Sequence, residues 1–530
     1  MAERIFLYDT TLRDGAQTQG VDFSVGDKRA IAEHLDAFGI DYVEAGWPGA
    51  NPVDDALFAN PPKLARARFT AFGMTRRAGR SAANDPGLAT VLASGARAVC
   101  LVGKTWDYHV TAALGVDRDE NLAMIRDTVA HAASKVDEVL FDAEHFFDGY
   151  KADGAYALAC LEAARDAGAR WIVLCDTNGG VLPHEVEPIV AAAGRVVAND
   201  RLGIHCHDDT GNAVANSLAA IRAGARQVQG SLNGLGERCG NTDLVSLIPT
   251  LVLKLGYETN VTPERLRLLT PLSRLVDELL TRAPDRHAPY VGAAAFAHKG
   301  GLHASAVAKD PRTYEHVDPA LVGNARAIVV SDQAGRANVL ARLGDLGIAV
   351  GPDDPALARL IEALKEREFA GYTYDGAEAS FELLARRSLG AVPEYFDVDG
   401  FRVSIERRHN ALGALVTQSE ATVKVTVDGE RIMNVAEGNG PVDALNLALR
   451  KDLGMYSVYL QDWRLVDYKV RIITPQAGTA AVTRVMIESA DGHARRWSTV
   501  GVSDNIIDAS FQALLDSIVF KLLRENAPAP

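Results

Sequence analysis

Short apolar segments alternate with longer amphipathic segments through the first half of the chain. The apolar segments are rich in β-branched or aromatic residues and end at polar residues or glycine, as buried parallel strands do. They cover residues 5–10, 41–46, 68–73, 98–103, 138–144, 171–177, 201–207 and 227–233. The stretches between them have helical periodicity and often end at glycine, which stops a helix.

Eight such strand–helix units predict an α/β fold, the (β/α)8 TIM barrel. An open doubly wound sheet is the alternative. The commonest form of that sheet carries G-x-G-x-x-G after its first strand, and no such motif follows residues 5–10. We therefore expect a catalytic barrel over residues 1–264.

The pattern changes after the barrel. Residues 265–395 contain amphipathic segments such as ALARLIEALKERE, which predict a helical linker with accessory subdomains. Residues 396–530 alternate again, and Asp428-Gly429 and Asp491-Gly492 each predict a turn between two strands, with a helix after each pair.

The last segment also repeats itself at a constant offset, which indicates an internal duplication of a strand–strand–helix unit. The matching positions are Val435 with Val500, Asp443 with Asp508, Ala444 with Ala509, and Leu449 with Leu514. We expect a C-terminal α+β regulatory or dimerisation domain, and a plain structural appendage is the alternative.

Charge and composition exclude some classes of function. The net charge is −14, which argues against a nucleic-acid binder because phosphate contacts need clustered lysine and arginine. No apolar run is long enough to span a membrane, and no signal peptide is visible at the start. The five cysteines are scattered and never in a C-x-x-C pair, which disfavours a disulfide framework or structural zinc site and suits the cytoplasm.

Polar residues gather where the predicted strands end. In a TIM barrel these ends meet at one mouth, where catalysis takes place. The residues expected there are Arg13, Asp14, Glu44, Lys104, His109, Asp142, Glu144, His145, Asp176, Thr177, His205, His207, Asn233 and Asn241.

The segment GIHCHDDTGNA carries a candidate metal site. Side chains alternate faces along a strand, so His205 and His207 share one face, while Cys206 points the other way and serves packing. Asp14 is in reach, because strand 8 lies between strands 1 and 7. Such mixed ligands suit Zn, Mn, Co or Fe, or Mg with waters. A hydrogen-bonded surface pair of histidines is the alternative.

Arg13, Glu44 and Thr177 suggest a substrate site beside that cluster. The Arg13 guanidinium fits a carboxylate in a fork, or it forms an ordinary pair with Asp14. We interpret Glu44 as the partner that holds Arg13. Thr177 either donates a hydrogen bond to the same carboxylate or caps a helix.

Several motifs together resemble the acyl-CoA-condensing barrel enzymes of the 2-isopropylmalate, homocitrate and citramalate synthase family. They are YDTTLRDGAQ, FDAEHF, GIHCHDDTGNAVANSL and NGLGERCGNT in the barrel, with GGLHAS and EGNGPVDA in regions that resemble the family's linker and regulatory region. The resemblance implies a Claisen-type condensation of acetyl-CoA with a 2-oxo acid, followed by hydrolysis of the thioester. It also implies one divalent ion, Mn, Mg or Zn.

The same resemblance implies a role for each matching residue. The metal ligands would be Asp14, His205, His207 and Asn241. The substrate would be bound by Arg13, Gln17, Glu44, His109 and Thr177, and the catalytic residues would be Arg13, Glu144, His303 and Tyr314. In the family the linker pair, here His303 and Tyr314, reaches the site of a neighbouring subunit, so a homodimer is implied. Asp209 matches a position expected to orient a ligand histidine.

Departures from the sister branches indicate the substrate. Ala16 replaces the glutamate of RDGEQ, Asp142 begins D-A-E-H where S-x-E-D is usual, and Asp208 stands in place of asparagine. With DYVEAGWPGANP, the pattern looks most like the citramalate branch, which condenses acetyl-CoA with pyruvate to give (R)-citramalate on the way to isoleucine. Trp106 is a candidate for excluding longer oxo acids, and isoleucine is the expected feedback effector at the C-terminal domain.

Three alternatives stay open. The first is a sister synthase that acts on 2-oxoisovalerate or 2-oxoglutarate. The second is a metal-dependent carbon–carbon lyase or aldolase on the same barrel, although simple lyases lack the C-terminal duplication. The third is a non-catalytic sensor that binds an amino acid through residues 400–525, which the intact set of expected ligands argues against.

Overall fold

The computed structural model describes residues 3–299, 301–328, 336–409, 411–493 and 495–530. They form two compact units. One unit comprises Met1–Phe296 with Glu315–Ala327, and the other comprises Ala297–Tyr314 with Ile328–Pro530. No helix among the described residues is long and apolar enough to cross a membrane.

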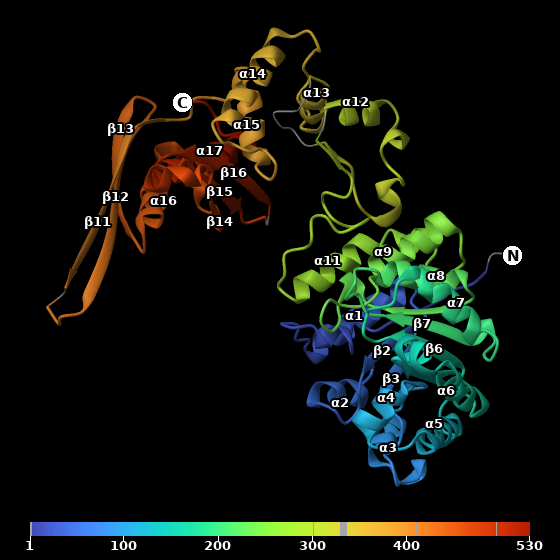
Figure 1. Ribbon diagram of the computed structural model, residues 1–530. Helices are drawn as coiled ribbons and strands as arrows, with labels where there is room; N and C mark the ends of the chain where they lie inside the picture. Colours follow the sequence, from blue (N-terminus) through green and yellow to red (C-terminus); the bar gives the residue numbers. More distant parts are fainter. Residues whose placement is uncertain (1–2, 300, 329–335, 410, 494) are drawn as a thin grey trace. The chain divides into compact units, whose positions relative to one another are not determined.

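The first unit is a closed barrel of parallel strands in the order β1 to β8, so the predicted TIM barrel is confirmed (Figure 1). The strands lie where the apolar segments predicted them. Their bounds are β1 Phe6–Asp9, β2 Tyr42–Gly46, β3 Arg68–Met74, β4 Ala98–Lys104, β5 Glu138–Glu144, β6 Trp171–Asp176, β7 Leu202–Cys206 and β8 Gln227–Gly230. Strand β8 is shorter than expected because Leu232–Gly234 forms a 3-10 turn with Asn233 at φ 56°.

Helices follow the strands and cover the outside of the barrel (Figure 1). They are α1 Val25–Phe38, α2 Pro52–Ala59, α3 Pro86–Ala93, α4 Asp107–His109, α5 Arg118–Ala133, α6 Phe146–Asp166, α7 Pro183–Ala193, α8 Ala213–Arg222 and α9 Leu244–Pro249. Helix α1 illustrates how local sequence signals set the ends of a helix. Ser24 and Asp27 form a reciprocal capping box at its start, and Gly39 ends it at φ 112°.

Large aromatic side chains fill the barrel interior. Trp171 and Tyr42 are buried there, and the Trp171 Nε1 donates to the Tyr42 hydroxyl over 3.0 Å. The Tyr42 hydroxyl in turn donates to Glu138 over 2.7 Å, at the start of β5. These residues lie at the starts of β2, β5 and β6 and fill the amino-terminal side of the barrel, whereas catalysis in TIM barrels takes place at the carboxyl ends of the strands.

Shorter elements connect the barrel to the C-terminal region. They are α10 Pro263–Leu266, α11 Leu269–Leu279, β9 Ala297–His298, α12 Gly301–Lys309, β10 Ala327–Ile328, α13 Arg336–Asp345, α14 Pro355–Phe369 and α15 Glu378–Ser388. The amphipathic helix α11 packs against α1 of the barrel. This part of the chain is mostly helical, as its pattern predicted.

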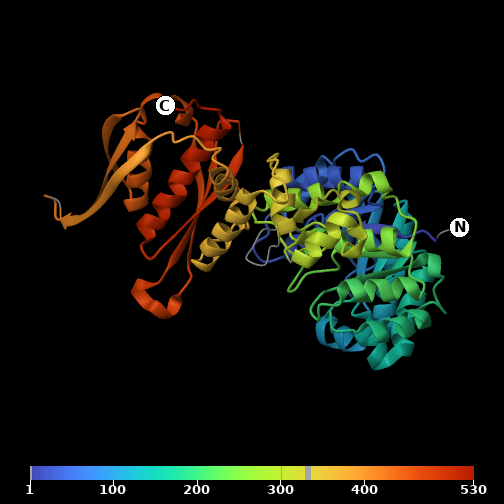
Figure 2. The ribbon, with the colours of Figure 1, turned by 90° about the horizontal axis from the view of Figure 1, so that it is seen from above.

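The C-terminal region contains two similar halves, so the predicted duplication is confirmed with one strand more in each half. Each half is a three-stranded antiparallel sheet followed by a helix. The first comprises β11 Asp397–His409, β12 Leu415–Val427, β13 Glu430–Gly438 and α16 Pro441–Lys451, and the second comprises β14 Arg464–Ile472, β15 Thr483–Ala490, β16 Arg496–Ser503 and α17 Ile506–Arg524. Helix α17 lies along β15 and β16 (Figure 2).

The two predicted turns differ in the structure. Asp428 and Gly429 have φ of 49° and 77° and join β12 to β13 directly, as a two-residue hairpin turn requires. Asp491 and Gly492 instead begin a longer connection, in which the backbone N–H of Asp491 donates to the carbonyl of Arg495. Asp491 also forms an ion pair with Arg495 at 2.6 Å, which stabilises this wider loop.

Helix α15 packs on the second half. The hydroxyl of Ser380 accepts a hydrogen bond from the backbone of Val500 and donates to Asp516, each over 3.0 Å. Arg387 adds an ion pair with Asp516 at 2.8 Å. The corresponding strand of the first half, β13, leaves Met433 and Val435 exposed among the described residues.

Candidate active site

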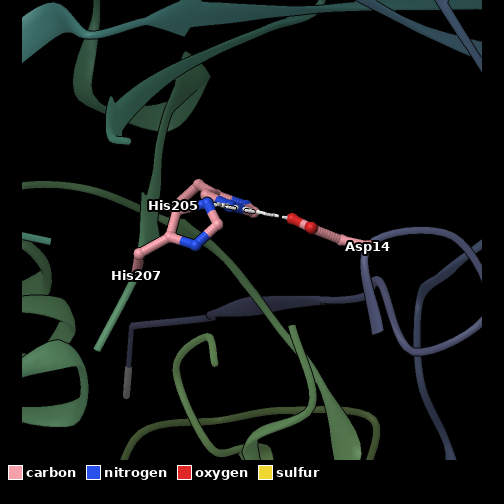
Figure 3. A group of neighbouring side chains, drawn as sticks. All are labelled: Asp14, His205 and His207. Atoms are coloured by element: carbon pink, nitrogen blue, oxygen red, sulfur yellow. Dashed lines mark hydrogen bonds and ion pairs between the residues drawn. The ribbon is translucent and has the colours of Figure 1, made fainter. Parts of the chain in front are cut away.

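Three predicted metal ligands converge at the carboxyl ends of the barrel strands (Figure 3). Asp14 lies in the loop after β1, His205 lies in β7, and His207 follows that strand directly. The Asp14 Oδ2 is 3.4 Å from the His205 Nε2 and 4.0 Å from the His207 Nε2, and the two Nε2 atoms are 3.4 Å apart. The two separations of 3.4 Å suit ligands of one ion, because ligand atoms about 2.1 Å from a shared metal lie roughly 3.0–3.4 Å from one another, while the Asp14–His207 separation of 4.0 Å is longer.

Asn241 completes the surroundings of the cluster. It pairs with His207 in an isolated β-bridge, and its Nδ2 donates to the Asp14 Oδ2 over 2.9 Å. Within the described part of the chain, the Asn241 Oδ1 is a buried acceptor with no hydrogen-bond partner. Rotation of the amide would exchange its oxygen and nitrogen, so Asn241 can present an oxygen ligand. The residues present therefore fit a divalent ion.

The cluster is strongly polarised. Burial alone would raise the pKa of Asp14, but Arg13 and the two histidines hold it well below its usual range. Burial and the neighbouring His205 lower the pKa of His207 to about 3. Asp14 is thus ionised and His207 neutral at physiological pH, which are the forms in which carboxylate and imidazole ligate metals.

Arg13 is held from one side, as expected. Its Nε donates to the Glu44 Oε2 over 2.7 Å, and the Tyr8 hydroxyl donates to the other Glu44 oxygen over 2.7 Å. The Arg13 guanidinium also lies 3.9 Å from the centre of the Phe72 ring. Burial would lower the pKa of Arg13, but Glu44 and Asp14 raise it overall, so the guanidinium is a fixed cation at the mouth of the barrel.

A cavity of about 320 Å³ opens beside the cluster. The predicted site residues Arg13, Asp14, Gln17, Glu144, Thr177, His205 and His207 line it. Glu44 lies behind Arg13, and His109 is also outside the described lining. The apolar part of the wall comes from Trp47, Phe72, Met74, Val102 and Leu114.

Glu144 and Thr177 each have a defined partner at the cavity. The Glu144 carboxylate is 2.5 Å from the Lys104 Nζ, and both residues line the cavity. The Thr177 hydroxyl accepts a hydrogen bond of 2.9 Å from the backbone N–H of His145, so its hydrogen is available to a ligand. His145 adopts φ 56°, in the left-handed region, as the chain enters α6.

His109, Trp106 and His145 form a cluster of rings near the end of β4. The His109 ring stacks on Trp106 at a centroid distance of 5.2 Å, and the His109 and His145 centroids are 4.0 Å apart. Trp106 is not part of the described cavity lining, so the expectation that it limits the size of the oxo acid stays a prediction.

Several polar residues near the mouth stabilise loops instead. Asp209 binds Arg238 with both oxygens, at 2.7 and 2.8 Å, so the expectation that it orients a histidine is wrong. Asp208 accepts from the backbone of Ala213 at the start of α8, which gives it a capping role. Asn233 donates to Ser273 and Asp277 of α11.

His303 and Tyr314 belong to the second unit. Their ring centroids are 4.1 Å apart with a tilt of 31°, and both side chains are exposed. The two predicted residues therefore contact each other. Their role in catalysis stays a prediction.

Gln229 is a residue of the site that the sequence analysis did not single out. It lies in β8 and bonds both His205 and Asp142. The signal for it was present, because QVQG places two glutamines on one face of an otherwise buried strand. A polar residue inside a buried strand needs a partner, which is grounds for suspecting a network.

Comparisons with known proteins agree with this architecture. The family model described as HMGL-like matches residues 4–272, the homocitrate synthase post-HMGL domain-like model matches residues 290–368, and the LeuA allosteric (dimerisation) domain matches residues 375–522. The (R)-citramalate synthase of Aquifex aeolicus is 51% identical over 99% of both chains, and that of Synechocystis sp. is 50% identical over 98% of this chain and 96% of its own. A solved HMG-CoA lyase from Acenitobacter baumannii is 21% identical, with a TM-score of 0.46, and covers 54% of this chain and 94% of its own.

The closed barrel and the Asp–His–His cluster at its mouth define an enzyme of the metal-dependent, HMGL-like class. The LeuA domain and the full-length relatives narrow this class. The chain belongs to the 2-isopropylmalate, homocitrate and citramalate synthase family.

Proposed function

We propose that this enzyme catalyses the (R)-citramalate synthase reaction. Acetyl-CoA condenses with the ketone of pyruvate, and hydrolysis of the thioester releases (R)-citramalate and CoA. The observation that carries the proposal is that Arg13 and the Asp14–His205–His207 cluster face one small cavity. Full-length relatives of that name, at 50–51% identity, favour it over the 2-isopropylmalate and homocitrate reactions.

The oxo acid is bound by charges that the protein has already arranged. Asp14, His205, His207 and Asn241 would hold the divalent ion, which when bound supplies Lewis-acid polarisation of the ketone. Arg13 receives the carboxylate of pyruvate, because Glu44 fixes its Nε and leaves the remaining N–H groups for the substrate. The Thr177 hydroxyl donates a further hydrogen bond to that carboxylate, while Gln17 lines the same cavity.

Proton transfer is assigned to Glu144 and to the pair His303 and Tyr314. Lys104 orients the Glu144 carboxylate at the cavity, where the methyl group of acetyl-CoA has to lose a proton to become a nucleophile. His303 and Tyr314 reach the site from a neighbouring subunit in this proposal and deliver or remove protons at the condensing carbonyl groups. The two rings lie beside each other, with centroids 4.1 Å apart.

The apolar wall of the cavity suits the methyl group of pyruvate. Phe72, Met74 and Leu114 form an apolar wall in a volume of about 320 Å³, which also has to hold the acetyl group. The methyl group of pyruvate is the smallest side chain among the candidate oxo acids. The isopropyl group of 2-oxoisovalerate and the carboxyethyl group of 2-oxoglutarate add bulk, and the latter adds a charge without a described partner on that wall.

Regulation and assembly are part of the same proposal. The LeuA match and the exposed Met433 and Val435 support a homodimer formed through residues 396–530. We assign residues 1–264 to catalysis, residues 265–395 to the linker, and isoleucine as feedback effector at the C-terminal domain. A cytoplasmic location suits the unpaired cysteines.

A thiol-release assay tests the proposal. Purified enzyme with acetyl-CoA and a divalent ion is offered pyruvate, 2-oxobutyrate, 2-oxoisovalerate or 2-oxoglutarate, and free CoA is followed with a thiol reagent. We expect the highest kcat/KM with pyruvate, loss of activity in EDTA, and inhibition by isoleucine. Release with 2-oxoisovalerate but not with pyruvate would overturn the assignment of the substrate.

A further inference from the structure

Gln229 connects a metal ligand to a carboxylate on β5, a strand that is not its neighbour in the barrel. Its Oε1 lies 2.9 Å from the His205 Nδ1, and its Nε2 donates to the Asp142 Oδ1 over 3.0 Å. The exposed fractions of Gln229, Asp142 and His205 are 0%, 3% and 4%. Strands β7 and β8 are neighbours and pair His205 with Gln229, whereas β5 lies elsewhere in the barrel, so the second bond crosses its interior.

The order of donors and acceptors in this chain follows from Asp142. The amide nitrogen of Gln229 faces Asp142, whose carboxylate oxygen accepts this hydrogen bond. The amide oxygen is then left facing His205. Since an amide oxygen only accepts, the His205 Nδ1 has to carry a hydrogen.

The consequence appears at the other ring nitrogen. When Nδ1 of a neutral imidazole carries the hydrogen, Nε2 holds the lone pair. The His205 Nε2 is the atom that faces Asp14 and His207, at 3.4 Å from each. The buried amide therefore selects the tautomer whose lone pair points into the ligand cluster.

We propose that Gln229, oriented by Asp142, is a positioning residue that fixes the His205 Nε2 as a metal ligand atom. This inference rests on the proposed metal site and deepens it. It also gives a function to the aspartate that distinguishes this chain's D-A-E-H segment from S-x-E-D.

The same strand offers a matched control. Gln227 is fully buried, two residues before Gln229 and on the same face of β8. Among the described residues, neither polar atom of its side-chain amide has a hydrogen-bond partner. Gln227→Met and Gln229→Met thus remove the same polar group from similar surroundings, but only the second breaks the chain to His205.

The test measures metal affinity rather than turnover. The metal-free chain is titrated with Zn²⁺ or Mn²⁺ by calorimetry, and the tautomer of His205 is followed by nitrogen-15 NMR. We expect Gln229→Met to weaken ion binding roughly 10–100-fold, as loss of a hydrogen bond to a ligand histidine does. Gln227→Met should stay within about threefold of the wild type, since it leaves every bond to His205 in place.

A double substitution tests whether ion affinity depends on the order of donors and acceptors or on the packing of the side chains. Asp142→Asn alone lets the Gln229 amide reverse and should weaken ion binding. Asp142→Asn combined with Gln229→Glu restores the order, because the carboxylate introduced on β8 accepts both from the amide introduced on β5 and from the His205 Nδ1. This isosteric pair should recover affinity to within a few-fold, and it answers the question even where Gln229→Met fails to fold.

The outcomes distinguish the two proposals. If the wild type binds ions while Gln229→Met and Gln227→Met behave alike, or if the double variant binds no better than Asp142→Asn alone, the positioning role is wrong and the metal site stands. If the folded wild type binds no divalent ion, the metal site itself is wrong, and this inference falls with it.

Discussion

The Nε of Arg13 donates a 2.7 Å hydrogen bond to the Oε2 of Glu44, and both residues lie at the mouth of the barrel. The pair is stabilised further by Tyr8, whose hydroxyl donates to the other Glu44 oxygen. Because Glu44 occupies the Nε edge of the guanidinium, the direction in which Arg13 presents its remaining N–H groups is set before a substrate arrives.

Replacement of Glu44 by Gln tests this orientation. The variant loses a charge-assisted hydrogen bond worth about 1.5–3 kcal/mol, so kcat/KM for pyruvate should fall by roughly ten- to a hundredfold, mainly through KM. Steady-state kinetics measure it. Tyr8→Phe is the control, because it keeps the Arg13–Glu44 pair and should cost less. Wild-type kinetics in E44Q would contradict an orienting role.

The barrel could be predicted from the sequence because its signal is local. Every predicted strand overlaps an observed one, since buried parallel strands are short apolar runs whatever lies around them. The convergence of Asp14, His205 and His207 could also be predicted from the sequence. In a TIM barrel only strand 8 lies between strands 1 and 7, so residues at the ends of those two strands are close together.

The predictions from sequence were wrong or incomplete where a residue's contacts depend on the three-dimensional arrangement of distant segments. Asp209 bonds Arg238 and not a histidine. QVQG marks Gln229 as a buried polar residue, but its partners on β7 and β5, 24 and 87 residues away, are known only from the structure. Loop direction and contacts across the barrel interior are not periodic, so no pattern along the chain predicts them.

Replacement of a metal ligand provides the next prediction. His207→Ala should abolish turnover and weaken Zn²⁺ or Mn²⁺ binding, because it deletes one of three converging ligand atoms. Circular dichroism should remain that of the wild type, because His207 lies at the mouth of the barrel and not in its core. His184→Ala is the control, since His184 is exposed on α7 and should leave both properties unchanged. Full activity in H207A would remove the metal assignment.

Mixing two inactive variants tests whether the linker pair serves a neighbouring subunit. His303→Ala damages the linker and His207→Ala the barrel. If sites are shared, random subunit exchange should restore about a quarter of wild-type activity, because half the dimers are hybrids with one intact site. The mixture of Asp14→Asn with His207→Ala should restore nothing, since every barrel then carries a lesion. Failure of the first mixture after verified exchange would place His303 and Tyr314 in their own subunit's site.

Asp9 predicts a pH dependence of stability. Burial, opposed by hydrogen bonds from Thr11, raises its pKa from 3.8 to about 7. The unfolded chain therefore loses this proton before the folded chain does, so the contribution of Asp9 is most favourable below about pH 4 and declines as the pH rises to about 7. Asp9→Asn removes the titration. Relative to the wild type, its free energy of unfolding should gain roughly 2–3 kcal/mol between pH 5 and pH 8.

Urea unfolding of the full chain at both pH values measures that difference. Thr11 still has a side-chain acceptor in the variant, so the loop after β1 keeps its local bond. A wild-type-minus-variant difference that does not change with pH would show that Asp9 is ionised in both states.

Ser517 predicts a stability effect in the C-terminal region. Its buried hydroxyl accepts from the Nε1 of Trp463 at 3.1 Å and of Trp497 at 2.9 Å, and donates to Ser489 at 2.7 Å. Ser517→Ala leaves two buried indole N–H groups unpaired, which should cost about 2–5 kcal/mol. Thermal unfolding followed by tryptophan fluorescence measures this loss. Ser388→Ala, which removes one bond to a backbone carbonyl on α15, should cost less than half as much.

The cavity wall and the ligand cluster come from different parts of the barrel. Met74 and Val102, on β3 and β4, contribute apolar surface, whereas the ligands and their hydrogen-bond chain come from β1, β5, β7 and β8. A mutation that reshapes the wall at Met74 or Val102 therefore leaves the ligand network intact. Single substitutions at the wall can therefore change the preferred oxo acid, in evolution or by design, while each intermediate variant keeps its metal ligands and stays active.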